Sequence, residues 1–255
     1  MLKIKNEADI AEIYISGTII DDEDSSWVKF WDDDPAGYQW PKEIKEQLDA
    51  VKDKPLTIYI NSYGGSVAAG VAMANMITRH PKSTTAIIDG YCCSIATQIF
   101  FSADTCKMPK NAYLMLHKPS TIEAGNADDF RKAADILDTI QCGLEVAYQN
   151  KKLDHLTDED ITEMVNRETW LTGEEAIRSF NIELLDSVKT VNCIGSLDKL
   201  KSLNYKKIPE ALKFKDDEKQ NSPSFLVQND CKKQIFDNSM KEIEIALARS
   251  RGLMI

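Results

Sequence analysis

The stretch LTIYINSYGGSVAAGVAMANMITR, residues 56–79, decides how the rest of the chain is interpreted. Residues 56–60 are mostly β-branched or aromatic and predict a strand, and residues 68–79 predict a helix of small residues that allows close backbone approach. Between them, Gly64 and Gly65 permit backbone conformations that are closed to other residues. Paired glycines can leave N–H groups pointing into a cleft, as an oxyanion hole requires, but they also suit a simple strand-to-helix turn.

The same succession of strand and helix continues along the chain and favours an α/β fold with crossover connections. We expect strands over residues 11–20, 83–89, 105–108, 112–116 and 184–188, and helices over 41–51, 95–101, 126–150 and 158–166 and from 172. Asn126 is a suitable N-cap for the long helix, and Thr172 with Glu175 forms a capping-box pattern. The acidic and aromatic residues 21–40 are expected to form a loop, and residues 90–94 a turn.

Composition excludes several classes of protein. The 255 residues carry 31 Lys and Arg against 41 Asp and Glu, a net charge of −10, which argues against binding nucleic acid. No apolar run approaches a membrane span, and the N-terminus has no hydrophobic signal region, so we expect a cytosolic protein without a membrane partner. The six cysteines lack metal-ligand spacing and are expected to be buried, reduced thiols. No metal and no cofactor is predicted.

The amino-acid composition of the chain changes after about residue 190. From there it becomes rich in Lys, Asp and Glu, and no glycine occurs between Gly195 and Gly252. We therefore divide it into a domain of residues 1–190 and a charged, partly helical C-terminal extension of residues 191–255. The extension suits either a helix docked on the domain or a segment that binds a partner.

Ser94 and His117 are the residues best placed for nucleophilic chemistry. Ser94 lies near the start of the helix expected from residue 95, where the N–H of Ile95 has no partner within the helix and the helix dipole favours negative charge. His117 follows the strand 112–116, and catalytic groups tend to project from strand ends. A neutral imidazole there could take the proton of Ser94. Each residue alone has a plain structural alternative: Ser94 as an N-cap, and His117 as a structural histidine with its hydrogen bonds satisfied.

Four motifs, in order, resemble those of the proteolytic subunit of Clp protease. They are NSYGGSVAAG at 61–70, GYCCSIA at 90–96, LMLHKP at 114–119 and RETWLTGEEA at 167–176. The resemblance covers roughly residues 10–190. It implies the spiral of ββα units shared by Clp proteases and crotonases, with the helix at 126–150 as the long handle helix.

The resemblance also implies roles for individual residues. Ser94 would be the nucleophile and His117 the general base, and the backbone N–H groups of Gly65 and Ile95 would form the oxyanion hole. The family's third triad member is an aspartate, and the matching residue here is Glu168, whose extra methylene requires a different distance from the backbone to the imidazole.

The implied activity is that of a serine endopeptidase that acts on polypeptides. Family members form rings of seven subunits, often two stacked, and work with an AAA+ unfoldase, so we expect a homo-oligomeric ring. Because the first strand is expected near residue 11, we expect little of the family's N-terminal axial segment in this chain. This layout, with the extension past residue 190, resembles the phage and prophage enzymes that act as head maturation proteases, whose partners are capsid proteins. A crotonase-like acyl-CoA enzyme and a catalytically degenerate structural homologue are the alternatives.

Overall fold

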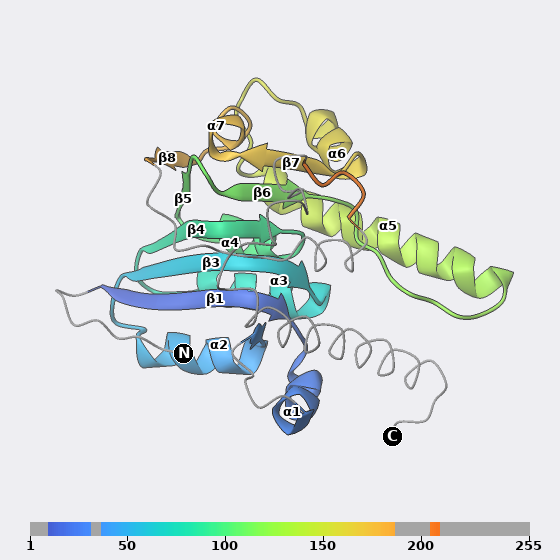
Figure 1. Ribbon diagram of the computed structural model, residues 1–255, viewed down its shortest axis with the longest axis horizontal. Coiled ribbons are helices and arrows are strands. Elements are labelled where there is room, and N and C mark those ends of the chain that lie inside the picture. Colours follow the sequence, from blue (N-terminus) through green and yellow to red (C-terminus); the bar gives the residue numbers. More distant parts are fainter. Residues whose placement is uncertain (1–9, 32–36, 187–204, 210–255) are drawn as a thin grey trace, which may run out of the picture. The chain divides into compact units, whose positions relative to one another are not determined.

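The computed structural model describes residues 10–31, 37–186 and 205–209 of the chain (Figure 1). The chain divides into two units, one made of residues 1–119 and 138–194 and the other of residues 120–137 and 195–255. The first unit contains all the described strands. The predicted extension lies outside the described residues apart from residues 205–209, so its partly helical character stays a prediction.

The first unit is built on a mostly parallel sheet, which confirms the predicted α/β class. Six strands follow the order β2-β1-β3-β4-β5-β8, and β6 pairs with β4 and with β7. All these pairs are parallel except β6 with β7, which is antiparallel. The strands are β1 (Ala11–Ile19), β2 (Tyr38–Gln39), β3 (Leu56–Gly65), β4 (Thr84–Cys93), β5 (Thr105–Pro109), β6 (Tyr113–Leu116), β7 (Thr169–Thr172) and β8 (Glu183–Leu185).

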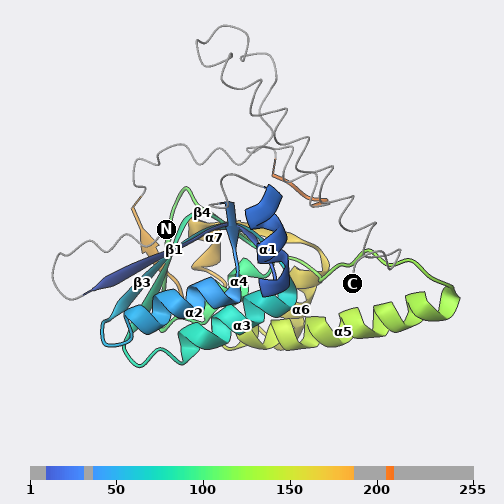
Figure 2. The ribbon, with the colours of Figure 1, turned by 90° about the horizontal axis from the view of Figure 1, so that it is seen from below.

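Helices cover one face of this sheet because every second strand residue on that face is apolar. The helices α2 (Pro41–Ala50) and α3 (Val67–Thr78) lie side by side below β1 and β3 (Figure 2), and α4 (Ala96–Phe101) packs against α3 and β4. Pro41 is the first helical residue, where its missing N–H costs nothing. The fully buried strand residues on this face include Ile13, Ile15, Ile19, Leu56, Ile58, Ile60, Ala86 and Ile88.

The predicted loop at residues 21–40 is wrong over half its length, because Asp22–Trp31 forms the helix α1. Three acidic residues, Asp22, Glu23 and Asp24, occupy its first turn, where the helix dipole stabilises negative charge. Ser25 adds a hydrogen bond from its hydroxyl to the carbonyl of Asp22 at 2.7 Å. The run of acids that suggested a solvated loop is therefore a helix start.

The strand-to-helix turn considered at the paired glycines and the turn predicted at residues 90–94 are largely extensions of β3 and β4. β3 continues through Gly65 and β4 through Cys93, with a shift in their pairing between Ile60 and Ser62. At that shift the side-chain oxygen of Asn61 accepts a hydrogen bond from the backbone N–H of Tyr91 at 3.0 Å. The side chain replaces a missing backbone partner, so both strands extend further than their local sequence indicated.

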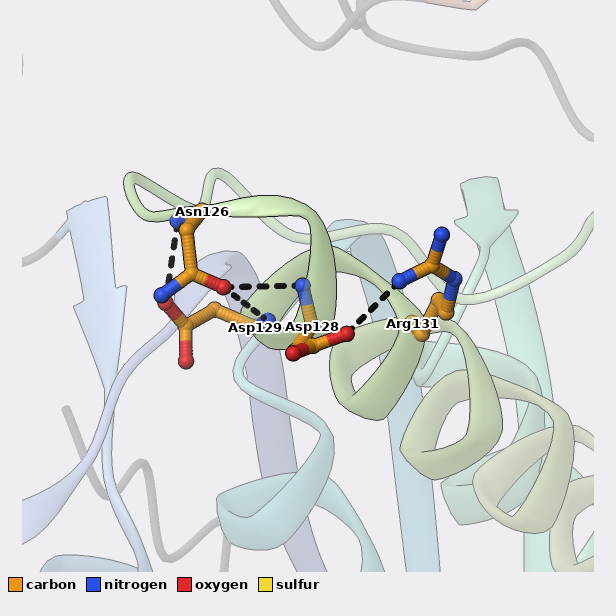
Figure 3. A network of polar contacts seen from close by, with 4 residues as sticks. All are labelled: Asn126, Asp128, Asp129 and Arg131. Atoms are coloured by element: carbon orange, nitrogen blue, oxygen red, sulfur yellow. Dashed lines mark hydrogen bonds and ion pairs between the residues drawn. The ribbon is translucent and has the colours of Figure 1, made fainter.

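Side-chain caps open α5 and α7, as predicted. α5 (Ala127–Gln149) begins after Asn126, whose side-chain oxygen accepts from the N–H of Asp128 at 2.8 Å, while Asp129 accepts from the N–H of Asn126 (Figure 3). α6 (Asp158–Asn166) begins with a capping box of its own. The capping box between Thr172 and Glu175 opens α7 (Gly173–Ala176), and the carboxylate of Glu175 accepts from both the backbone N–H and the hydroxyl of Thr172 at 2.8 Å.

The cysteine prediction holds for three of the four described cysteines. Cys92, Cys93 and Cys106 are buried free thiols, but Cys142, on α5, is exposed. Burial raises the pKa of Cys92, Cys93 and Cys106, which keeps them protonated. The remaining two cysteines lie outside the described residues.

Two helical glycines offer a matched test of the packing between α3 and the segment before α4. A Cβ added at Gly70 would lie 2.3 Å from Cγ1 of Ile95, whereas one added at Gly143 meets nothing within 4 Å. Gly143→Ala should therefore stabilise the protein by up to about 1 kcal/mol through helix propensity. Gly70→Ala should instead destabilise it by about 1–3 kcal/mol through overpacking. Chemical denaturation of both variants checks this, and a stabilised Gly70→Ala protein would contradict the described packing.

Candidate active site

Ser94 is held in a strained backbone conformation between β4 and α4. Its φ angle is 57°, in the left-handed region that non-glycine residues rarely adopt and that costs about 1–3 kcal/mol. Its neighbours Cys93 and Ile95 are fully buried, but Ser94 itself is only half-buried. The strain therefore turns one hydroxyl out of an otherwise buried segment.

The pairing of β4 with β6 brings Ser94 and His117 together. Cys93 pairs with Met115, and the N–H of Ser94 donates to the carbonyl of Met115 at 3.0 Å. The residues that follow the two parallel strands therefore leave the sheet at the same edge. There the Nε2 atom of His117 lies 2.8 Å from the Oγ atom of Ser94, within hydrogen-bonding distance.

Burial keeps the imidazole of His117 in its neutral form. Loss of solvent lowers the pKa of His117, and the negative charge of Glu168 opposes this shift by raising it. The larger effect is burial, so the net pKa lies below its ordinary value of 6.5. A neutral imidazole whose Nε2 faces a hydroxyl can accept the proton of that hydroxyl.

The antiparallel register of β6 and β7 places Glu168 beside His117. Leu116 pairs with Thr169, so the residue that follows β6 and the residue that precedes β7 are neighbours. Glu168 has a φ angle of 54°, a second left-handed non-glycine residue at this site. The indole Nε1 of Trp170 donates to its Oε1 atom at 3.3 Å. Its charge also raises the pKa of Cys93, the residue before Ser94.

The paired glycines pack directly against the nucleophile turn. Gly64 and Gly65 have φ angles of 94° and 147°. A Cβ added at Gly64 would lie 2.8 Å from Cβ of Ser94 and 3.2 Å from the nitrogen of Ile95, and one added at Gly65 would lie 2.0 Å from the carbonyl oxygen of Ile19. Only glycine allows this approach, so the backbone of β3 ends beside Ser94 and the N–H of Ile95.

The N–H of Ile95 is available to a ligand within the described part of the chain. Ile95 is the N-cap of α4, and no described backbone or side-chain group accepts from its nitrogen. The five residues predicted for the site thus come from four segments of the first unit that meet at one edge of the sheet. Sequence reasoning missed Trp170, although the alternation of strand residues puts positions 168 and 170 on the same side.

The residues that the structure describes contain no group of three or more His, Cys, Asp or Glu side chains arranged to hold a metal ion. Across the same described ranges, no helix has the length and apolar character needed to span a membrane.

The fold and site define an α/β protein with a serine hydroxyl hydrogen-bonded to a histidine at the strand ends. The family model described as Clp protease matches residues 42–189, a range that contains all five site residues. The chain therefore belongs to the Clp protease family.

Curated relatives agree with this assignment at modest identity. ATP-dependent Clp protease proteolytic subunit 3 of Streptomyces coelicolor is 31% identical over 127 residues, 48% of this chain and 56% of that protein. Proteolytic subunit 2 of Thermobifida fusca is 27% identical over 136 residues, 49% of this chain and 62% of that protein. The aligned region thus spans less than two thirds of these relatives' length.

Among solved structures, a mutant of ClpP1 from Listeria monocytogenes matches with a TM-score of 0.54 at 19% identity, covering 71% of this chain and 94% of that one. This last likeness shows the fold.

The opposing influences on His117 lead to a prediction about its titration. Glu168→Gln removes the charge that raises the pKa of His117, so that pKa should fall below its wild-type value. NMR titration of the imidazole signals measures it, and the chain's only other histidines, His80 and His155, provide internal reference signals. Glu163→Gln, which removes an exposed carboxylate paired with Arg167, is the matched control and should leave the His117 curve in place. An unchanged or raised pKa in Glu168→Gln would contradict the described arrangement.

Proposed function

We propose that the chain is a serine endopeptidase that acts through Ser94, His117 and Glu168. The observation that carries the proposal is the 2.8 Å contact between Oγ of Ser94 and Nε2 of the half-buried imidazole of His117. Membership of the Clp protease family supports peptide-bond hydrolysis as the reaction. The proposed role of Glu168 rests on its register beside His117 and on the effect of its charge on the pKa of that residue.

The proposed reaction has two halves. The hydroxyl of Ser94 attacks a peptide carbonyl while His117 takes its proton, and the N–H groups of Gly65 and Ile95 stabilise the resulting oxyanion, each worth about 3 kcal/mol. His117 then returns the proton to the leaving amine, which departs and leaves an acyl-enzyme. Water, deprotonated by His117, hydrolyses this ester and restores Ser94. Glu168 holds the imidazole in place and stabilises its cationic form.

The alternatives fit the site less well. A crotonase-like acyl-CoA enzyme would use paired N–H groups in a similar way but has no need of a serine bonded to a histidine. A degenerate homologue would not be expected to keep that bond or the strained serine that makes it. Glu168 in place of aspartate is the one feature in favour of degeneration, and its position beside His117 weakens that argument.

We further propose that the enzyme works as a homo-oligomeric ring in the cytosol. The described part of α5 exposes large apolar side chains, Phe130, Ile136 and Val146, which suits a helix that packs against another subunit. An AAA+ unfoldase or capsid proteins are the proposed partners, and maturation of phage or prophage proteins is the proposed role. Unfolded or flexible polypeptides are the substrates that an enclosed site would admit.

Loss of the nucleophile should abolish activity. Ser94→Ala removes the only atom proposed to form a covalent bond, so labelling by a fluorophosphonate probe and hydrolysis of an unfolded protein such as casein should both disappear. Ser120→Ala, at an exposed serine three residues after His117, is the control and should keep both activities. Persistent labelling of Ser94→Ala would show that another residue is the nucleophile.

Assembly should depend on the exposed apolar residues of α5. Phe130→Glu places a charge where the proposal expects a subunit contact, so the ring should dissociate into smaller species. Lys132→Glu, also exposed on the same helix, is the control for added negative charge and should disturb assembly less. Sedimentation velocity separates the species, and a wild-type protein that is monomeric at micromolar concentration would refute the ring.

A further inference from the structure

The short helix α4 carries two buried polar side chains next to Ser94. Thr97 is fully buried and Gln98 is nearly so. The carbonyl oxygen of Ser94 accepts two hydrogen bonds from Thr97, one from its backbone N–H at 3.0 Å and one from its hydroxyl at 2.5 Å. The carbonyl of the strained residue is therefore fixed from two directions.

The hydroxyl of Thr97 is in turn bonded to α5. The OH of Tyr148, a residue only 2% exposed, lies 2.7 Å from Oγ1 of Thr97. Gln98, the next residue after Thr97, also ties α4 to α5, because its Nε2 donates to the carbonyl of Leu144 at 2.9 Å. Burial raises the pKa of Tyr148, so its hydroxyl stays protonated. These residues belong to the first unit, as does Ser94.

The directions of these hydrogen bonds follow from the chemistry of the groups. A carbonyl can only accept, so the single proton of the Thr97 hydroxyl goes to Ser94. The oxygen of Thr97 must then accept from the hydroxyl of Tyr148. The chain of hydrogen bonds therefore runs from Tyr148 through Thr97 to Ser94, and each bond polarises the next.

The anchored carbonyl belongs to the same peptide unit as the N–H of Ile95. This unit is planar and trans, so its C=O and N–H point in opposite directions and turn together. Fixing the oxygen of Ser94 from one side fixes the direction of the Ile95 N–H on the other. The same two hydrogen bonds to the Ser94 carbonyl also hold the left-handed backbone of Ser94, which directs its hydroxyl toward His117.

We propose that Thr97 and Tyr148 are positioning residues for the Ser94–Ile95 peptide unit. Through it they keep the Ile95 N–H aimed at the oxyanion and the Ser94 hydroxyl aimed at His117. The inference rests on the proposed function, because it takes Ser94 as the nucleophile and Ile95 as an oxyanion donor. Neither Thr97 nor Tyr148 touches the reacting atoms.

Thr97→Val tests this proposal, since it keeps the volume and removes the hydroxyl. Its kcat should fall about tenfold with KM unchanged, part of the effect expected for loss of an oxyanion donor. The inhibition constant of a peptide aldehyde, which forms a tetrahedral adduct, should rise by the same factor. The acid limb of the pH profile should stay in place, because His117 and Glu168 are untouched. Thr97→Ser, which restores the hydroxyl, should recover most of the rate.

Two further variants separate positioning from stability. Thr78→Val removes a threonine hydroxyl that is bonded to the carbonyl of Ala74 on the exposed side of α3, away from Ser94, and should leave kcat unchanged. Tyr148→Phe should lower kcat about threefold, and the double variant Thr97→Val/Tyr148→Phe should be no slower than Thr97→Val, because both act through one chain of bonds. If Thr97→Val does not fold, Tyr148→Phe and Thr97→Ser decide the question.

The outcomes distinguish this inference from the proposed function. A wild-type protein that neither reacts with a fluorophosphonate nor hydrolyses casein would overturn the proposed function and the inference with it. An active wild type whose Thr97→Val and Tyr148→Phe variants keep kcat and aldehyde affinity within twofold would overturn the inference alone. Proportional loss of kcat and aldehyde affinity, with melting temperatures well above the assay temperature, is the result we expect.

Discussion

The pairing of β4 with β6 is the constraint on which the candidate site depends. β4 pairs with β5 through Thr85–Ile87 and with β6 through Tyr91–Cys93, so it changes partner along its length. The change lets β6 end beside β4, and the Met115 carbonyl then holds the N–H of Ser94. Carboxyl ends of parallel strands collect at one edge of a sheet, and the hydroxyl and the imidazole meet there. Without this register the two residues, 23 positions apart in sequence, would have no reason to lie within hydrogen-bonding distance of each other.

Two opposing electrostatic effects, of which burial is the larger, set the pKa of His117. Burial alone would make the protonated imidazole costly, and a base that cannot carry its proton is of little use in acyl transfer. The carboxylate of Glu168 moderates that cost, while burial keeps the resting imidazole neutral. In the proposed triad, Glu168 stands where the family has an aspartate. Its backbone is left-handed and its carboxylate accepts a hydrogen bond from the indole of Trp170, two local features that the family resemblance did not indicate.

Much of the fold could be predicted from local patterns, because strands with alternating apolar residues and helices with capping residues can be recognised in a single sequence. Asn126 and Thr172 cap their helices as expected because capping depends on a few adjacent residues. The misassigned α1 shows the limit of such patterns, because a run of acids suits both a solvated loop and a first helical turn. The ends of β3 and β4 were missed because the Asn61 side chain that bridges them acts across 30 residues of sequence. The left-handed conformations of Ser94 and Glu168 also depend on tertiary contacts. The sequence could therefore identify these residues as candidates but could not predict their backbone conformation.

The antiparallel strand β7 completes the site late in the chain. A protein emerging from the ribosome exposes the serine and the histidine long before residue 168 is synthesised, and Glu168 reaches His117 only once β7 has docked on β6. Formation of the three-residue site therefore waits for contacts that are distant in sequence and slow to form. If the three residues act together as proposed, the nascent polypeptide has no complete site until β7 is in place.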